Sequence, residues 1–453
     1  MRKVIGWSLF LYVGFALLIY WYLFGWNHEL IPDMYKGTSA DPETFMNARE
    51  LTLSQDYSRV KNLLFFLATP LEWIILLFVL VLGISKKFEK WSKETTKINV
   101  LQVAIYFFYL SLLTTVLALP MQWIGRKVSV DYGISTQSTQ SWIKDHVIDF
   151  WVNYATMLLI VTVLLWLIRK FPKRWWLAGW ALSVPFTIFL TFVQPVIIDP
   201  LYNDFSTLKN KELETKILAM ADKADIPAKH VYEVNMSKKT NSLNAYVTGI
   251  GLNSRIVMWD TTLKQLKDKE ILFIMAHEMG HYVMKHIYWG VGSYIFISFI
   301  GMYLISRILN MCIRKWGDTL QISKMACFSI LPLFFLISSV LSFASQPATN
   351  YVSRIEERAA DQYALNMTKD GKSGVKTFQY LSKTSLSQVN PPALVKFFLY
   401  THPPIFERIH TFEQYEKKKK RSSDYATSFY RNISLVLGIF IIAFYCDFVN
   451  NKL

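Results

Sequence analysis

Cysteine is scarce in this sequence, with three residues in a chain of 453. Cys312, Cys327 and Cys446 lie in or near apolar runs, and no C-x-x-C motif is present. The cysteines therefore indicate neither a disulfide framework nor a cysteine-ligated metal site. Internal repeats, low-complexity segments and RNA- or DNA-binding motifs are also lacking, so the net charge of +16 does not indicate a nucleic-acid partner. The lysines crowd the loops between apolar segments, as is typical beside anionic lipid headgroups.

Hydrophobic residues are abundant, at 52% of the chain, and aromatic residues make up 16%. A bilayer crossing takes about 20 apolar residues, and seven runs are long enough. They are Val4–Trp26, Leu63–Ile84, Ile98–Ile124, Val147–Ile168, Trp175–Ile198, Ile287–Leu309 and Ala326–Pro347. An eighth run, Ile433–Val449, is shorter, and we expect it to span rather than to lie in the interface. The first run is too long and too aromatic for a signal peptide. The sequence predicts a mainly α, polytopic membrane protein that contacts the lipid bilayer.

The stretch "AHEMGH" carries the strongest chemical signal. A helix beginning at or just after Asp268 places His277 and His281 one turn apart on one face, where both imidazoles can reach one metal ion. Glu278 is rotated by about 100° from His277, which suits a general base better than a ligand. The motif therefore predicts a zinc site in a hydrolytic enzyme.

A third protein ligand is needed, and "SRIEERAAD" offers the best candidates. Glu357 and Asp361 are four residues apart on one face of a predicted helix, whereas Glu356 is rotated away from that face. We therefore expect Glu357 to be the ligand and Asp361 to orient one of the ligand histidines.

The sequence resembles the integral-membrane zinc metalloproteases of the CAAX prenyl protease type 1 (Ste24-like) family between Gln194 and Arg408. Six segments carry the resemblance in order: "PLYNDFSTL", "SKKTNSLNAYVTG", "IVMWDTTL", "AHEMGHYVMKH", "SRIEERAAD" and "HPPIFERI". The resemblance implies seven helices around an intramembrane chamber, closed by a small α+β zinc-metalloprotease domain.

Site residues carried over from the resemblance comprise three groups. The metal ligands would be His277, His281 and Glu357 for one Zn²⁺ per chain, with Glu278 as the catalytic base. His286 and Asp361 would support the ligands. Asn244, Ala245 and Tyr246 match an edge strand that binds the substrate backbone, and His402 and Arg408 match residues beside the metal that stabilise the oxyanion.

The expected domain organisation follows from the spans and these motifs. Residues 1–199 form a five-span membrane region, 287–347 a two-span hairpin, and 429–453 the eighth span and tail. Residues 200–286 and 348–428 form the two parts of the zinc protease domain. In the first part, "NKELETKILAMADKADIP" predicts an amphipathic helix, and "HVYEVNM", "NSLNAYVTG" and "RIVMWDTTL" predict short strands.

The resemblance implies an endopeptidase that removes C-terminal residues after a prenylated cysteine, in a bacterial cell membrane or the endoplasmic reticulum membrane. One alternative is a quality-control metalloprotease that degrades unfolded or misfolded membrane proteins. The non-enzyme alternative is a membrane channel or transporter with a structural zinc ion.

The orientation of the zinc domain stays open. Five spans place it on the opposite side from the N-terminus, and the basic loops Lys86–Lys97 and Arg169–Arg174 lie on the N-terminal side. The positive-inside rule would put the zinc domain outside, whereas the resemblance to eukaryotic members implies the cytosol.

Overall fold

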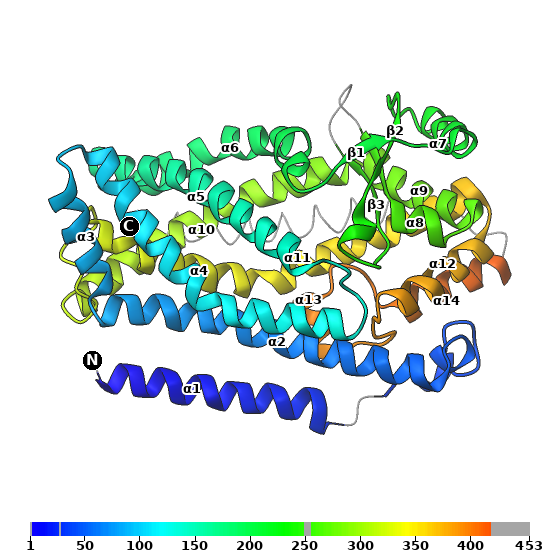
Figure 1. Ribbon diagram of the computed structural model, residues 1–453, viewed down its shortest axis with the longest axis horizontal. Helices are drawn as coiled ribbons and strands as arrows, with labels where there is room; N and C mark the ends of the chain where they lie inside the picture. The colour runs from blue at the N-terminus through cyan, green and yellow to red at the C-terminus, as the bar shows by residue number, and fades with distance from the viewer. Residues whose placement is uncertain (1, 27–28, 249–254, 418–453) are drawn as a thin grey trace, which may run out of the picture.

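A computed structural model describes residues 2–26, 29–248 and 255–417. Within these residues, six helices are long and apolar enough to cross a membrane, and a bent pair, Trp175–Thr191 with Gln194–Leu201, brings the number to seven if it counts as one span. The prediction of a mainly α, polytopic membrane protein is confirmed. A small mixed sheet lies at one end of the helices (Figure 1).

The predicted spans correspond to long helices that run along the molecule (Figure 1). Their bounds are α1 (Arg2–Tyr20), α2 (Ala48–Val81), α4 (Asn99–Asp131), α5 (Thr139–Lys170), α6 (Trp175–Val193), α10 (His286–Trp316) and α11 (Leu331–Thr368). At 1.5 Å per residue, α2 and α11 are about 51 and 57 Å long, against about 30 Å of hydrocarbon. Both helices therefore extend well beyond the bilayer. The eighth predicted run, Ile433–Val449, lies outside the described residues.

The helices share a core at the end of the molecule away from the sheet. Buried side chains of α4 lie between Val103 and Leu110, and those of α5 lie between Val161 and Ile168. This end is capped by the short helix α3 (Ile84–Thr95), which packs against α4 (Figure 1). The halves of α4 and α5 nearer the sheet contribute no buried residue.

The sheet has the order β1-β2-β4-β3 among the described residues. Its strands are β1 (Phe205–Thr207), β2 (Val231–Val234), β3 (Ala245–Thr248) and β4 (Arg255–Trp259). β2 and β4 are parallel, and the two outer pairings are antiparallel. The predicted amphipathic helix is α7 (Lys211–Lys223), and a short helix, α8 (Asp260–Gln265), follows β4. β3 is thus an edge strand.

The helix with the H-E-x-x-H motif, α9 (Asp268–Val283), begins at the expected residue and packs on the sheet. Met275 and Met279 of α9 share a core with Ala245 of β3 and Met258 of β4. This packing holds the motif directly beside the edge strand.

Two helix boundaries differ from what the sequence patterns alone indicate. The chain does not continue as one helix from α9 into the sixth span, because Lys285 adopts a left-handed conformation with φ 58° and α10 starts afresh at His286. Conversely, α11 does not end at Pro347, where the seventh predicted span ends, but continues through this proline to Thr368. The span and the segment that carries Glu357 are therefore one helix.

The C-terminal part of the described chain closes the domain over α9 and α11. It contains α12 (Gly371–Thr384), α13 (Ala393–Leu399) and α14 (Ile405–Lys417). Phe412 of α14 and Phe378 of α12 are buried against Phe273 of α9. Ile31 and Met46, from the loop before α2, join the same core.

Candidate active site

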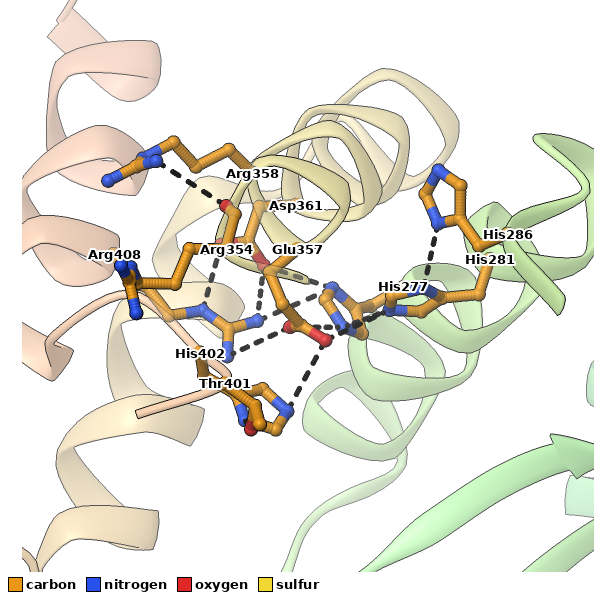
Figure 2. Close-up of polar contacts among 10 residues, drawn as sticks. All are labelled: His277, His281, His286, Arg354, Glu357, Arg358, Asp361, Thr401, His402 and Arg408. Carbon is orange, nitrogen blue, oxygen red and sulfur yellow. Dashed lines mark hydrogen bonds and ion pairs between the residues drawn. The ribbon is translucent and has the colours of Figure 1, made fainter. Parts of the chain in front are cut away.

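His277 and His281 of α9 meet Glu357 of α11 in one cluster, in which His277 and Glu357 are buried and His281 is partly exposed (Figure 2). The two Nε2 atoms are 3.1 Å apart, and each lies 3.3 Å from an oxygen of the Glu357 carboxylate. One ligand atom from each residue falls within 4.8 Å of the others. The structure thus brings together the three predicted ligands, and the rival carboxylate, Glu356, is not among them.

A close approach of α9 and α11 makes the cluster possible. Gly280, inside the motif, faces Tyr363, and a Cβ atom at Gly280 would lie 3.1 Å from the Tyr363 Cβ. Such a distance is tighter than ordinary carbon–carbon contact. A glycine at this position therefore lets the two helices come near enough for the ligands to meet.

Asp361 lies one helical turn beyond Glu357 and links the cluster to α14. Its Oδ1 is 3.0 Å from His277 Nδ1, which matches the predicted orienting role. Arg408 donates to the same carboxylate through Nε at 2.8 Å and Nη2 at 2.5 Å, and its guanidinium lies 4.0 Å from the Phe378 ring centroid. The guanidinium is therefore committed mainly to Asp361, with Nη1 3.5 Å from Glu357.

His286 contacts the site through His281, with 2.9 Å between their Nδ1 atoms (Figure 2). In a continuous helix, residues five apart would be rotated by about 140° and would face different sides. The left-handed Lys285 between α9 and α10 returns His286 to the face of His281. The break thus explains how His286 can support a ligand.

His402 approaches the cluster from the loop between α13 and α14, with Nε2 3.3 Å from Glu357 Oε1 (Figure 2). Its Nδ1 is 2.8 Å from Thr401 Oγ1. Arg354, which the sequence patterns did not single out, holds this loop by donating to the carbonyls of Lys396 and Tyr400. Its spacing, three residues before Glu357, was the signal that could have revealed it.

The electrostatics of the cluster favour a cation at its centre. Burial opposes a charge on His277, but the carboxylates of Glu357 and Asp361 outweigh it and raise the pKa of His277 to about 10. Two imidazole nitrogens and one carboxylate oxygen also form a donor set typical of catalytic zinc, which keeps a fourth position for water or substrate. The residues therefore fit a bound Zn²⁺.

Glu278 lines a cavity of about 670 Å³. His277, His402 and Arg408 line the same cavity. Burial is the largest influence on Glu278 and raises the pKa of its carboxyl group. A carboxylate with a raised pKa is a better proton acceptor than an ordinary one.

The edge strand borders the same cavity through Asn244 and Ala245. The Asn244 carbonyl accepts a hydrogen bond from the Trp259 N–H and therefore points toward β4. In an antiparallel pair the main-chain groups of successive residues point to opposite sides, so the N–H and C=O groups of Ala245 point to the free edge. The Ala245 N–H bonds the Asn244 side chain at 2.9 Å, and its methyl group is buried in the core of the sheet. The predicted third member, Tyr246, does not line the cavity, and its side chain points to the other face.

Comparisons with known proteins agree with this geometry. Residues 207–416 match the profile of peptidase family M48, and residues 33–204 match the profile described as "CAAX prenyl protease N-terminal, five membrane helices". The chain is 53% identical to the Bacillus subtilis (strain 168) protein "Uncharacterized metalloprotease YhfN" over 416 residues, which are 92% of this chain and 98% of that protein.

More distant similarities extend the picture. The chain is 28% identical to "CAAX prenyl protease 1" of Saccharomyces cerevisiae over 71% of this chain and 74% of that protein. Its structure is similar to the crystal structure of S. mikatae Ste24p, with a TM-score of 0.75 and 22% identity over 90% of this chain and 98% of that chain. The latter similarity shows a shared fold.

Proposed function

We propose that this chain, a multi-pass membrane metalloprotease that belongs to peptidase family M48, holds one Zn²⁺ on His277, His281 and Glu357 and cleaves peptide bonds with Glu278 as general base. The observation that carries the proposal is the three-residue donor cluster beside a cavity lined by a carboxylate outside the ligand set. Membership of a peptidase family removes the channel or transporter alternative.

In this proposal each residue around the cavity has a separate role in peptide-bond hydrolysis. Zinc would supply a Lewis acid that polarises the scissile carbonyl. Glu278 takes a proton from the attacking water and passes it to the leaving amine. His402, exposed on the cavity wall, donates to the oxyanion that develops on the carbonyl. Arg408 acts through Asp361, because two of its nitrogens are bonded to that carboxylate.

The substrate backbone would lie along β3, at the free edge next to the metal cluster. The outward N–H and C=O groups of Ala245 would pair with an extended peptide, and Asn244 would release its bond to the Ala245 N–H as the peptide arrives. Main-chain pairing is independent of side-chain identity, which suits an enzyme that accepts varied residues near the cut.

Metal content tests the ligand set. Purified Glu357→Gln protein should lose most of its zinc in elemental analysis, whereas Glu356→Gln should keep about one ion per chain. Both variants replace a carboxylate by an amide of the same shape at adjacent positions, so each is the control for the other. Zinc loss in Glu356→Gln alone would contradict the assignment.

For the substrate class we propose peptides cut after a prenylated cysteine near the C-terminus. Its support is the names of two relatives, "CAAX prenyl protease 1" of Saccharomyces cerevisiae and "CAAX prenyl protease 1 homolog" of Arabidopsis thaliana, at 28% and 27% identity. A farnesylated peptide should be cleaved at least about ten-fold more efficiently than the same peptide without the lipid. Equal cleavage of both peptides, together with degradation of an unfolded protein such as casein, would favour the quality-control alternative.

A further inference from the structure

The cavity has a second polar wall, away from the metal cluster, formed by α2 and α11. Lys61 of α2 lies in this wall and is exposed, and among the described residues Lys61 makes no hydrogen bond or ion pair. The neighbouring Asn62 is 5% exposed and also lines the cavity, and its Nδ2 has no hydrogen-bond partner in the described chain. Gln346 of α11 also lines this wall, and its amide oxygen is buried without a hydrogen-bond partner among the described residues.

Such a wall is built to receive a polar ligand. An unpaired buried amide costs on the order of 1–3 kcal/mol, which a bound partner would recover. The ammonium of Lys61 and the N–H groups of Asn62 are donors, so the group they fit is an anion with acceptor oxygens. The other acidic and basic residues of the cavity lining are His277, Glu278, His402 and Arg408, and all four belong to the metal end.

The pairing of α2 with α11 gives the separation of Lys61 from the metal cluster along the helix axes. The Trp73 indole N–H donates to Ser339, and the rings of Phe65 and Phe343 stack, so α2 and α11 run antiparallel. These pairings place Lys61 level with residues 347–351 of α11.

The residues of α11 that lie level with Lys61 precede Glu357 by about six to ten positions. At 1.5 Å per residue this separation is about 9–15 Å. An extended peptide covers the same distance with about three to five residues, at about 3.3 Å each.

We propose that Lys61, assisted by Asn62, binds the free C-terminal carboxylate of the substrate and thereby directs cleavage to a bond about three to five residues from the chain end. This inference rests on the proposed peptidase function and adds a specificity-determining residue to it. The carboxylate is the anion that every unmodified peptide carries at one end, and a cavity of about 670 Å³ has the volume of a site for a short peptide segment.

The test uses the zinc-loaded, full-length protein in detergent and one internally quenched ten-residue apolar peptide, made with a free C-terminal carboxylate and as the amide. The wild-type kcat/KM should be about ten- to a hundred-fold higher for the acid than for the amide. Mass spectrometry should place the cut in the acid about three to five residues from its end.

Substitution of Lys61 should remove the discrimination between the two peptides. Lys61→Met should lower kcat/KM for the acid to the value for the amide, mainly through KM, and leave the amide unchanged. Lys61→Arg should retain most of the preference, because it keeps the charge. Lys90→Met is the matched control and should behave as wild type, because the Lys90 side chain is exposed on α3 at the far end of the molecule.

The outcomes separate this inference from the function on which it rests. Equal cleavage of acid and amide by the wild type, or an equal loss for both peptides in Lys61→Met with normal zinc content, would overturn the role of Lys61. If Lys61→Met does not fold, Asn62→Leu and Lys61→Arg decide the question by the same acid-to-amide ratio. Wild-type protein that cleaves neither peptide, with or without a farnesyl group, would contradict the proposed function itself.

Discussion

Replacing Asp361 by asparagine should weaken both the fold and the metal site. Asp361 is 2% exposed, and its side chain lies between His277 and Arg408, which is itself 6% exposed. Asparagine keeps the shape but removes the charge, so the guanidinium is left buried without its main counter-ion. Breaking a buried pair in this way costs about 3–5 kcal/mol. We expect the lower end, because Arg408 keeps Glu357 at 3.5 Å and the ring of Phe378 at 4.0 Å.

The metal site should respond separately. Asp361 fixes the orientation of His277 through its Nδ1, and loss of such a support lowers metal affinity by about 10–100-fold. Chemical unfolding of the metal-free protein in detergent measures the first effect, and competition with a zinc chelator measures the second. Asp361→Asn should therefore lose stability without metal and also bind zinc more weakly.

A double variant separates the two effects. Asp361→Asn with Arg408→Met removes the unpaired buried cation, so the stability of the metal-free protein should recover by most of the loss. The zinc affinity should stay low, because His277 still lacks its carboxylate partner. A single Asp361→Asn variant with wild-type stability and zinc affinity would refute the reasoning.

Two further predictions concern the contact of the helices and the capture of the peptide. Gly280→Ala should destabilise the protein by about 1 kcal/mol in thermal unfolding, because the cost of overpacking against Tyr363 exceeds the gain in helix propensity. Gly301→Ala is the control and should be neutral or stabilising, because no other atom lies within 4 Å of the added methyl group. Substrate peptides N-methylated at one position at a time should lose cleavage at alternate positions beside the scissile bond, as pairing with the free edge at Ala245 requires. Equal stability of the two alanine variants would contradict the first prediction. Loss of cleavage at every N-methylated position, without alternation, would contradict the second.

The sequence predicts those features that depend on short stretches of chain. Span positions follow from apolar runs, and the His277–His281 pair follows from helical periodicity because both residues lie on one helix. The choice of Glu357 over Glu356 also follows from periodicity, since Asp361 shares a face with only one of them. The structure brings Glu357 to the two histidines.

Features that depend on tertiary contacts could not be predicted in the same way. The bond between Arg408 and Asp361 joins residues that are 47 positions apart in the sequence. The resemblance implied a role for Arg408 at the oxyanion, and no pattern in the sequence indicated its bond to Asp361. The continuation of α11 through Pro347 and the three-residue strand β1 are also set by neighbours rather than by propensity. The position of His286 depends on one left-handed residue, Lys285, which no periodic pattern reveals.

The most direct test of the central claim is zinc content and peptide cleavage measured on one preparation of Glu278→Gln. The substitution removes the proton acceptor but none of the three ligands, so the protein should bind one zinc ion per chain as the wild type does. Turnover of a peptide that the wild type cleaves should fall by at least about 100-fold. A Glu278→Gln protein with full zinc and wild-type turnover would contradict the account.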